Sequence, residues 1–156
     1  SCSVELDGVD AEAPVAPDDS AASSTVECFS AATTPADPGD GTDNCGIPTK
    51  SGPVILNTPP TNTCGEGSRS YTWTYEDAEG NSDTYVYTYT ITDNTAPVAP
   101  ADDGTTVECI SDATTPATPT DVTDNCGGVI SPEGPDMIEL ITDCEGTRTY
   151  TWTYTD

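Results

Sequence analysis

Two segments of the chain alternate between aromatic or β-branched residues and threonine. Residues 71–75 read YTWTY, and residues 85–91 read YVYTYTI. A period of two places successive side chains on opposite faces of a pleated strand, and residues of these types fit such a surface better than they fit a helix. Both segments are therefore expected to be β-strands, joined by a turn at residues 77–81.

The remainder of the chain is interrupted by 14 prolines and 13 glycines, and it shows no sustained apolar pattern of period 3.6. Very little helix is expected. Prolines within residues 34–38 and 115–119 remove amide donors, so these segments are expected to be edge or crossover pieces rather than central strands. The pattern predicts an all-β fold of the sandwich type.

The same order of motifs occurs twice. VEC at 26–28 returns at 107–109, DNCG at 43–46 returns at 124–127, and YTWTY at 71–75 returns at 150–154. A fixed period of roughly 80 residues is typical of tandem modules. We expect an N-terminal segment at 1–10, a first immunoglobulin-like module at 11–94, and a second module at 95–156 that lacks its last strand.

Cysteine content points to an extracellular protein. The chain has 156 residues, seven cysteines and no histidine. Modules of about 80 residues bury too little surface to be very stable alone, so cross-links are expected to support them. In this setting cysteines indicate disulfides of an oxidising compartment rather than zinc ligands.

The charge balance excludes two classes of partner. The chain carries 28 acidic and three basic residues, for a net charge of −25. Such a field repels nucleic-acid phosphates and anionic lipids, so neither nucleic acid nor a membrane surface is expected to bind. The sequence contains no signal-peptide core and no run of 18 apolar residues, and a soluble mature chain is expected.

Taken together, the motifs resemble a known family. VEC, TP, TDNCG, CxGxR, YTWTY, DxxGN and a closing strand before TAP follow one another as in hyalin-repeat (HYR) and related immunoglobulin-like modules of bacterial surface proteins and filaments. The resemblance implies an extracellular sandwich that serves adhesion or acts as a spacer, without catalytic residues. Many such repeats have a fourth cysteine where this chain has Ala78, which leaves Cys45 without the family's usual partner.

The sequence offers no catalytic motif. It has no histidine to act as a general base, and no serine or cysteine stands beside an evident base, so the protein is not expected to be an enzyme. No cofactor is expected, with the exception of calcium bound by oxygen ligands in turns near the module ends. Turns also favour Asp and Asn for their own backbone hydrogen bonds. The calcium candidates are Asp43, Asp77, Asp93, Asn94 and Asp124.

The aromatic strands are expected to fill the cores. The chain has one Phe and one Met, so its tyrosines and tryptophans are the main large residues available for packing. A sugar-stacking stripe is the alternative, and it requires an exposed Trp73 or Trp152. Arg69 and Arg148 precede these strands and are expected to bind loop carbonyls or an Asp.

A covalently attached glycan is a further expectation. Asp19-Ser20-Ala21 resembles the Asp-Ser/Thr-small O-glycosylation signal of some bacterial surface proteins, which makes Ser20 the candidate acceptor. The alternative is an ordinary polar loop.

The first ten residues resemble the strand that the second copy lacks. Aligning Pro14 with Pro97 places Cys2, Val4 and Leu6 on Tyr85, Tyr87 and Tyr89. We therefore expect residues 1–10 to be a donor strand that enters the second module of a neighbouring copy. The expected acceptor core consists of Tyr150, Trp152 and Tyr154.

Repetition of this contact predicts a head-to-tail polymer. The expected function is that of a structural subunit of an extracellular bacterial filament or pilus-like fibre, with copies of itself as partners. Two alternatives remain open: a two-repeat segment of a long adhesin stalk, and a carbohydrate-binding module.

Disulfide pairing follows from the expected order of strands. The end of the first strand and the approach to the aromatic strand lie at one pole of an immunoglobulin-like module, which pairs Cys28 with Cys64 and Cys109 with Cys144. Cys126 is expected to bond Cys2 of a neighbouring subunit, and Cys45 is then the odd thiol.

Overall fold

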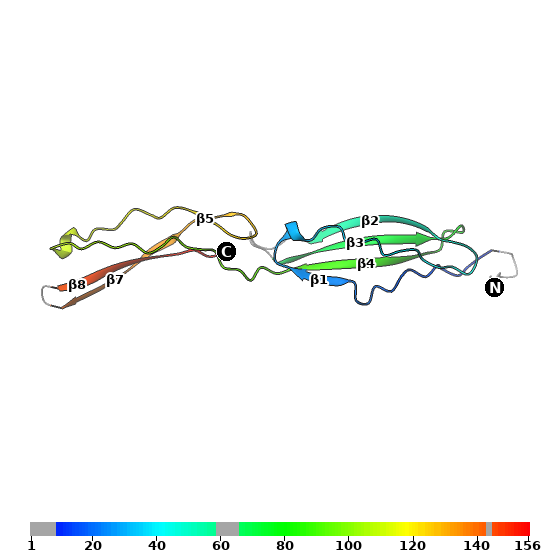
Figure 1. Ribbon diagram of the computed structural model, residues 1–156, viewed down its shortest axis with the longest axis horizontal. Helices are drawn as coiled ribbons and strands as arrows, with labels where there is room; N and C mark the ends of the chain where they lie inside the picture. The colour runs from blue at the N-terminus through cyan, green and yellow to red at the C-terminus, as the bar shows by residue number, and fades with distance from the viewer. Residues whose placement is uncertain (1–8, 59–65, 143–144) are drawn as a thin grey trace. The chain divides into compact units, whose positions relative to one another are not determined.

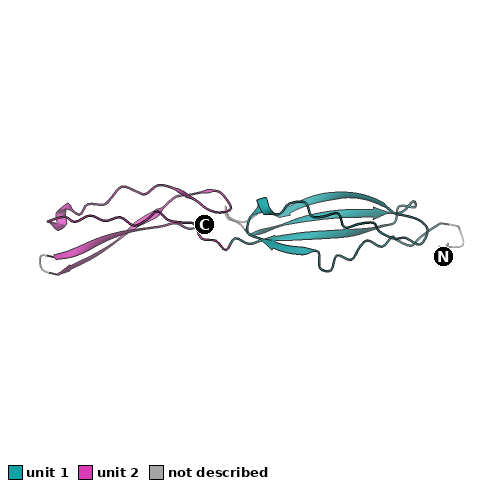
Figure 2. Ribbon diagram, viewed as in Figure 1, with its two compact units in different colours: residues 1–61, 65–93 teal, residues 62–64, 94–156 magenta. Residues whose placement is uncertain are grey.

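The computed structural model describes residues 9–58, 66–142 and 145–156. Contacts divide the chain into unit 1, whose described residues lie between 9 and 93, and unit 2, whose described residues lie between 94 and 156 (Figure 2). The described residues form strands and two short 3-10 helices, η1 (Phe29–Ala31) and η2 (Ile110–Asp112), and no α-helix. The predicted all-β class is confirmed.

Unit 1 contains a four-stranded sheet with the order β1-β4-β3-β2 (Figure 1). β3 pairs antiparallel with β2 and β4, whereas β1 pairs with β4 in parallel. β4 is therefore a central strand that lies between β1 and β3. The strands are β1 (Ser23–Val26), β2 (Thr49–Thr58), β3 (Gly67–Glu76) and β4 (Ser82–Ile91).

The turn between β3 and β4 is organised by Asp77. Its Oδ1 accepts hydrogen bonds from the backbone N–H groups of Glu79 and Asn81, at 3.0 and 2.8 Å, and its Oδ2 accepts one from the Asn81 amide at 2.7 Å. The Asn81 side chain is the main reason that the pKa of Asp77 lies below its usual value. Gly80 supplies the positive φ of 92° that completes the turn.

The core of unit 1 is the aromatic row of β3. Tyr71, Trp73 and Tyr75 are 2%, 4% and 0% exposed. Tyrosines of β4 cover this row, with ring centroids 5.7 Å apart for Trp73 and Tyr85 and 6.2 Å apart for Tyr71 and Tyr89. The prediction that these aromatic residues form the core is confirmed for unit 1, and the burial of Trp73 excludes it as a sugar-stacking surface.

The proline-rich segment after η1 covers the same core without forming a strand. The hydroxyl of Tyr71 donates to the carbonyl of Ala32, and the hydroxyl of Tyr75 donates to the carbonyl of Gly39, each at 2.8 Å. Burial raises the pKa of Tyr75. Side chains of the sheet thus bind the carbonyls of a segment whose prolines cannot donate to a ladder. This layer over the sheet agrees with an immunoglobulin-like sandwich.

Unit 2 repeats part of this arrangement. β7 and β8 form an antiparallel hairpin equivalent to β2 and β3, and β5 pairs with β6. The hydroxyl of Tyr150 donates to the carbonyl of Ala113 at 3.1 Å, and that of Tyr154 donates to the carbonyl of Thr120 at 2.9 Å. The strands are β5 (Val122–Thr123), β6 (Val129–Ile130), β7 (Glu133–Thr142) and β8 (Glu145–Thr153).

Candidate functional site

The described part of unit 2 contains no counterpart of β4. In unit 1, β3 pairs on one side with β2 and on the other with β4. In unit 2, β8 pairs with β7, and no second partner of β8 occurs among the described residues. One edge of β8 therefore exposes backbone groups that, in unit 1, take part in a ladder.

The counterpart of β1 is also missing as a strand. β1 occupies residues 23–26, where it pairs with β4 alone, and the repeat aligns it with residues 104–107. Residues 104–107 are exposed and form no strand, and Val107 is 39% exposed. Both differences concern the position that β4 occupies in unit 1, which corresponds in unit 2 to the space between residues 104–107 and β8 and is filled by no described strand. We call this position the strand slot.

Two aromatic side chains of β8, together with Tyr154 directly after its end, lie beside the strand slot. Tyr150, Trp152 and Tyr154 are partly exposed, whereas their counterparts in β3 are fully buried. The Trp152 Nε1–H is buried and has no hydrogen-bond partner among the described residues. The second aromatic row therefore lacks the cover that the β4 tyrosines give to the first.

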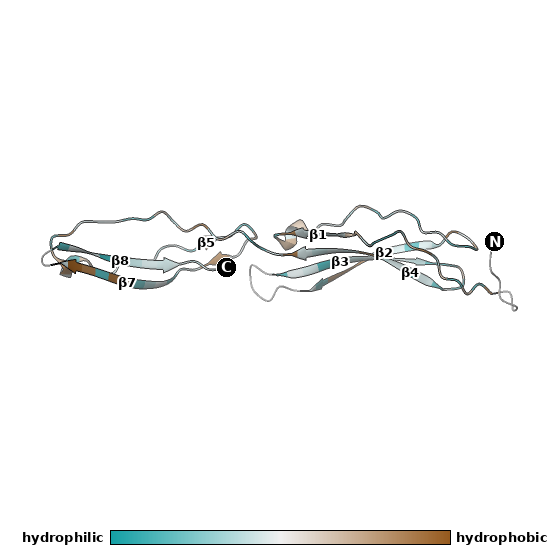
Figure 3. Ribbon diagram, turned by 90° about the horizontal axis from the view of Figure 1, so that it is seen from below, coloured by the Kyte–Doolittle hydropathy of each residue, from teal (hydrophilic) through white to brown (hydrophobic). Residues whose placement is uncertain are grey.

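Exposed apolar residues on β7 do not by themselves mark the slot. Ile138 and Leu140 are 61% and 69% exposed, and part of β7 has the hydrophobic colour in Figure 3. The equivalent strand of unit 1 behaves in the same way, with Val54 and Leu56 at 68% and 66%. The features that distinguish unit 2 from unit 1 at the strand slot are thus β8 and residues 104–107.

The predicted donor residues Cys2, Val4 and Leu6 lie outside the part of the chain that the structure describes. Strand donation remains a prediction.

Both arginines perform the structural role that the sequence suggests. The Arg69 guanidinium donates to the carbonyls of Phe29 and Ala32, and it lies 5.3 Å from the centre of the Phe29 ring. Arg148 donates to the carbonyl of Ala113 at 2.7 Å and to the carboxylate of Glu139. Each arginine therefore fixes its 3-10 helix region against the adjacent hairpin.

The cysteines correct two predictions. Cys109 is a free, exposed thiol, so the predicted bridge to Cys144 is wrong for this structure. Cys45 is disulfide-bonded, so it is not the odd thiol. The reason is that pairing depends on the local approach of loops, which the strand order alone does not determine.

The other predicted bridges are partly visible. Cys28 is disulfide-bonded, and its expected partner Cys64 lies outside the described residues. Cys126 is disulfide-bonded within the single chain, so its expected bridge to Cys2 of a neighbouring subunit is not formed in this structure.

We predict that a thiol-specific alkylating reagent labels Cys109 in the folded, unreduced protein. Cys28, Cys45 and Cys126 should stay unlabelled, because disulfide sulfurs do not alkylate. Peptide mass spectrometry after labelling reads out each site, and the Cys109→Ser variant is the control. Quantitative label on Cys45 with none on Cys109 would contradict the assignment.

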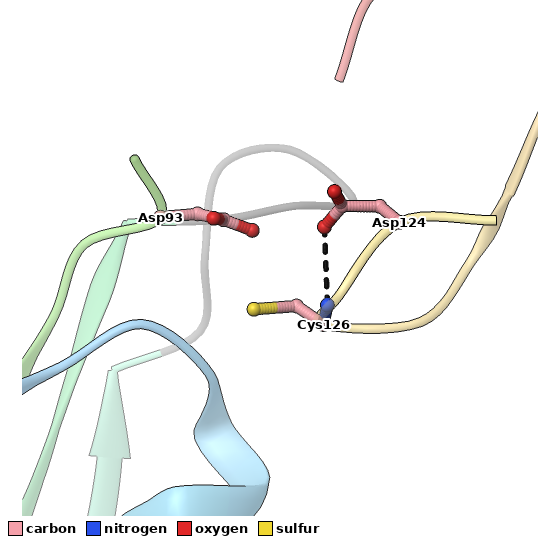
Figure 4. A group of neighbouring side chains, drawn as sticks. All are labelled: Asp93, Asp124 and Cys126. Atoms are coloured by element: carbon pink, nitrogen blue, oxygen red, sulfur yellow. Dashed lines mark hydrogen bonds between the residues drawn. The ribbon is translucent and has the colours of Figure 1, made fainter. Parts of the chain in front are cut away.

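The repeated DNCG turns use their aspartates for the backbone. Asp43 Oδ2 accepts from the N–H of Cys45 at 2.9 Å, and Asp124 Oδ2 accepts from the N–H of Cys126 at 3.0 Å (Figure 4). Asp93 ends unit 1 and Asn94 begins unit 2. Calcium binding by the predicted set of residues stays untested, and these hydrogen bonds give Asp43 and Asp124 a turn-forming role.

A further acidic group, which the sequence did not reveal as a set, lies within unit 1. Asp10, Asp77 and Glu79 each place a carboxylate oxygen within 4.8 Å of the others. Asp77 was among the calcium candidates, whereas Asp10 and Glu79 were not. DxE at 77–79 was the available sequence signal, but Asp10 is too distant along the chain to be linked to it by spacing.

Ser20 lies on the surface, as an acceptor for a glycan requires. Its side chain is exposed, and its backbone N–H donates to Asp18 Oδ1 at 2.9 Å. This hydrogen bond is the main cause that lowers the pKa of Asp18. Glycosylation of Ser20 remains a prediction.

Comparison with known proteins identifies the family. The model of the HYR-like domain with 4 cysteines matches residues 15–91 and again residues 97–156. This chain belongs to the HYR-like family. The predicted resemblance is confirmed, and so is the presence of two repeats. No curated protein and no solved structure matches the sequence.

Membership in the HYR-like family defines a general role. HYR-like repeats are structural or adhesive modules of an extracellular type. Each of the two matched stretches contains three cysteines rather than four. Among the described residues, no helix is long and apolar enough to cross a membrane.

Proposed function

We propose that the protein is a structural subunit of an extracellular filament or pilus-like fibre that polymerises head to tail by strand addition in trans. The strand slot in unit 2 is the observation that carries this proposal. Residues 104–107 and β8 both lack the partner that their counterparts share in unit 1. One inserted strand supplies both ladders, because β4 does so in unit 1.

The sequence before unit 1 has the features of the missing strand. Residues 2–8 stand in the same relation to Pro14 as residues 85–91 do to Pro97. β4 is the last strand before unit 2, so residues 2–8 correspond to the last strand of a module that precedes unit 1. In a filament, this preceding module is unit 2 of the neighbouring copy.

The β3–β4 ladder specifies the expected register. Tyr85 pairs with Trp73 and Tyr87 pairs with Tyr71. In the repeat, Cys2 and Val4 correspond to Tyr85 and Tyr87, and Trp152 and Tyr150 correspond to Trp73 and Tyr71. Cys2 is therefore expected opposite Trp152 of the neighbouring copy, and Val4 opposite its Tyr150. Val4 and Leu6 then take the positions from which the β4 tyrosines cover the aromatic row of β3.

The parallel β1–β4 ladder specifies the pairing on the other side of the donated strand. Ser24 pairs with Tyr89 across β1 and β4. The same alignment places Thr105 opposite Leu6. A single strand therefore satisfies both flanks of the strand slot in one register, with Val4 and Leu6 on the core side.

Burial of these two side chains gives the contact its expected strength. Complete burial of a Val or Leu side chain stabilises by about 1.5–3 kcal/mol, and the new backbone ladders add to this. The proposed donor strand, residues 2–8, and the proposed acceptor, the strand slot of unit 2, are different parts of the chain. The contact is therefore heterologous, and its repetition generates an open fibre.

Electron microscopy of the purified chain tests the proposal, with a chain that lacks residues 1–10 as the comparison. The complete chain should form fibres, and the shortened chain should remain monomeric on size-exclusion chromatography. Identical fibres from the shortened chain, with unit 2 fully folded, would replace strand donation by the tandem-adhesin function.

A further inference from the structure

Unit 1 contains a group of acidic side chains whose proposed role does not depend on polymerisation. Carboxylate oxygens of Asp10, Asp77 and Glu79 lie within 4.8 Å of one another beside the β3–β4 turn. Like charges at this separation repel one another, and a low-dielectric surrounding strengthens the repulsion. A group of this kind is stable when a positive charge lies among its members.

Asp10 is the buried member of the group. Its exposed fraction is 7%, and its Oδ1 accepts the backbone N–H of Glu12 at 3.1 Å. Its Oδ2 is buried and accepts no hydrogen bond from the part of the chain that the structure describes. Burial of a carboxylate oxygen without a partner is unfavourable unless a cation or a donor compensates it.

The position of Asp10 is fixed by the turn itself. The Asn81 side-chain amide donates to the backbone carbonyl of Asp10 at 3.2 Å and to Asp77 Oδ2 at 2.7 Å. One amide group thus holds the two acidic residues side by side, although the first precedes the sheet and the second follows β3. The cluster is a consequence of tertiary structure and not of local turn preference.

Asp43 lies beside two members of this group. Its Oδ2 accepts the N–H of Cys45, whereas its Oδ1 is buried and accepts no hydrogen bond from the described residues. Asp43, Asp77 and Glu79 line one hollow with a volume of about 60 Å³. This volume accommodates an ion together with water.

The chain's own cations are engaged elsewhere. Lys50 donates to the carbonyl of Gly39. It also pairs with Asp37, and this hydrogen bond raises the pKa of Lys50. Arg69 binds two backbone carbonyls, and Arg148 binds Glu139. These three are all the basic residues of the sequence. These three side chains therefore do not neutralise the acidic group, which leaves it open to a cation from the solution.

We propose that Asp10, Asp43, Asp77 and Glu79 bind a calcium ion. All four offer hard oxygen ligands, and Ca²⁺ accepts six to eight such ligands in irregular geometry, with water completing the set. Mg²⁺ requires a near-octahedral arrangement and retains its own water more strongly. Soft metals are disfavoured because no histidine is present and Cys45, the cysteine at this hollow, is disulfide-bonded.

The site explains how the segment before β1 is fixed to unit 1. Val9 alone separates Asp10 from residues 1–8, so a calcium ion would connect the chain at this point to the turns at residues 43–46 and 77–81. Extracellular calcium modules bind with dissociation constants of about 10⁻⁴–10⁻³ M. An affinity in this range is expected here.

Calorimetric titration of the complete chain with CaCl₂ tests the proposal, together with thermal unfolding in calcium and in EDTA. One ion should bind to unit 1, and calcium at tens of times the dissociation constant should raise its melting temperature by several degrees. Asp10→Asn and Glu79→Gln should each weaken binding by about tenfold or more. Asp10→Asn keeps the size of the side chain, and circular dichroism verifies its fold.

Matched control variants distinguish the loss of a calcium ligand from a general loss of negative charge. Asp40→Asn and Glu76→Gln remove the same charge from exposed positions of unit 1 and should leave calcium affinity unchanged. Equal affinity in all four variants, or no calcium-dependent heat and no shift in melting temperature, would overturn the site. These measurements do not require fibres, so they can fail while strand donation succeeds, and the reverse also holds.

Discussion

A chain that carries both Val4→Asp and Leu6→Asp is expected to form no fibres. In the proposed register both side chains face the aromatic row of β8, where each new carboxylate would be buried without a partner. Such burial costs several kcal/mol per group, which exceeds what each side chain contributes. The change should therefore block assembly over the whole concentration range in which the unaltered chain polymerises, as measured by light scattering and electron microscopy.

Ser1→Asp with Ser3→Asp is the matched control. It adds the same two charges to the same segment, but a strand places odd and even positions on opposite faces. These fibres should form with a normal appearance. If both double variants polymerise equally well, the segment is not a donor strand. If neither polymerises, added charge rather than the filling of the core determines assembly.

The two tryptophans are expected to differ in their contribution to stability. Trp73 is 4% exposed and packs against Tyr85, so Trp73→Ala should destabilise unit 1 by about 3–5 kcal/mol. Trp152 is partly exposed in a row without cover. In monomers, Trp152→Ala should cost about half as much or less, because less of the side chain leaves a packed environment. In fibres, the same change should prevent a stable junction.

Urea unfolding measures this difference in the monomeric Val4→Asp, Leu6→Asp background. The tryptophan that remains in each variant reports by fluorescence on the unmutated unit, and circular dichroism reports on both. Equal costs for Trp73→Ala and Trp152→Ala would show that unit 2 completes its core without an added strand.

The sequence predicted those elements that depend on local alternation. YTWTY at 71–75 and the threonine-rich strand β4 after the turn produce one aromatic face each. The structure buries the face of β3 and partly buries the face of β4. Proline positions predicted equally well that residues 34–38 would not be a central strand, because the missing amide donors are a property of the residue itself.

Elements without alternation were not predicted. β2 contains three consecutive apolar residues at 54–56 and a change of register between Ser51 and Val54. Gly52 accommodates this change at a φ of +105°, where an added Cβ would lie 2.7 Å from the carbonyl oxygen of Thr72. Gly134 has the same role in β7, at a φ of +122°. Such bulges depend on the partner strand, so the local sequence carries little sign of them.

Groups of residues that lie far apart in the sequence were the hardest to predict. Cys109 and Cys45 were assigned wrongly because strand order fixes the pole of a module but not which thiols meet there. The acidic group of unit 1 was missed for a similar reason. Asp10 and Asp77 are brought together by the amide of Asn81, and no spacing rule links residues so far apart.

Hydrogen–deuterium exchange tests the strand slot most directly. Fibres of the unaltered chain are compared with monomers of the Val4→Asp, Leu6→Asp variant. Residues 23–26, paired with β4 in both samples, serve as the internal reference. We predict strong protection in fibres, and fast exchange in monomers, at residues 104–107 and at the β8 amides that do not pair with β7. Equal exchange at both flanks in fibres and monomers would contradict strand donation.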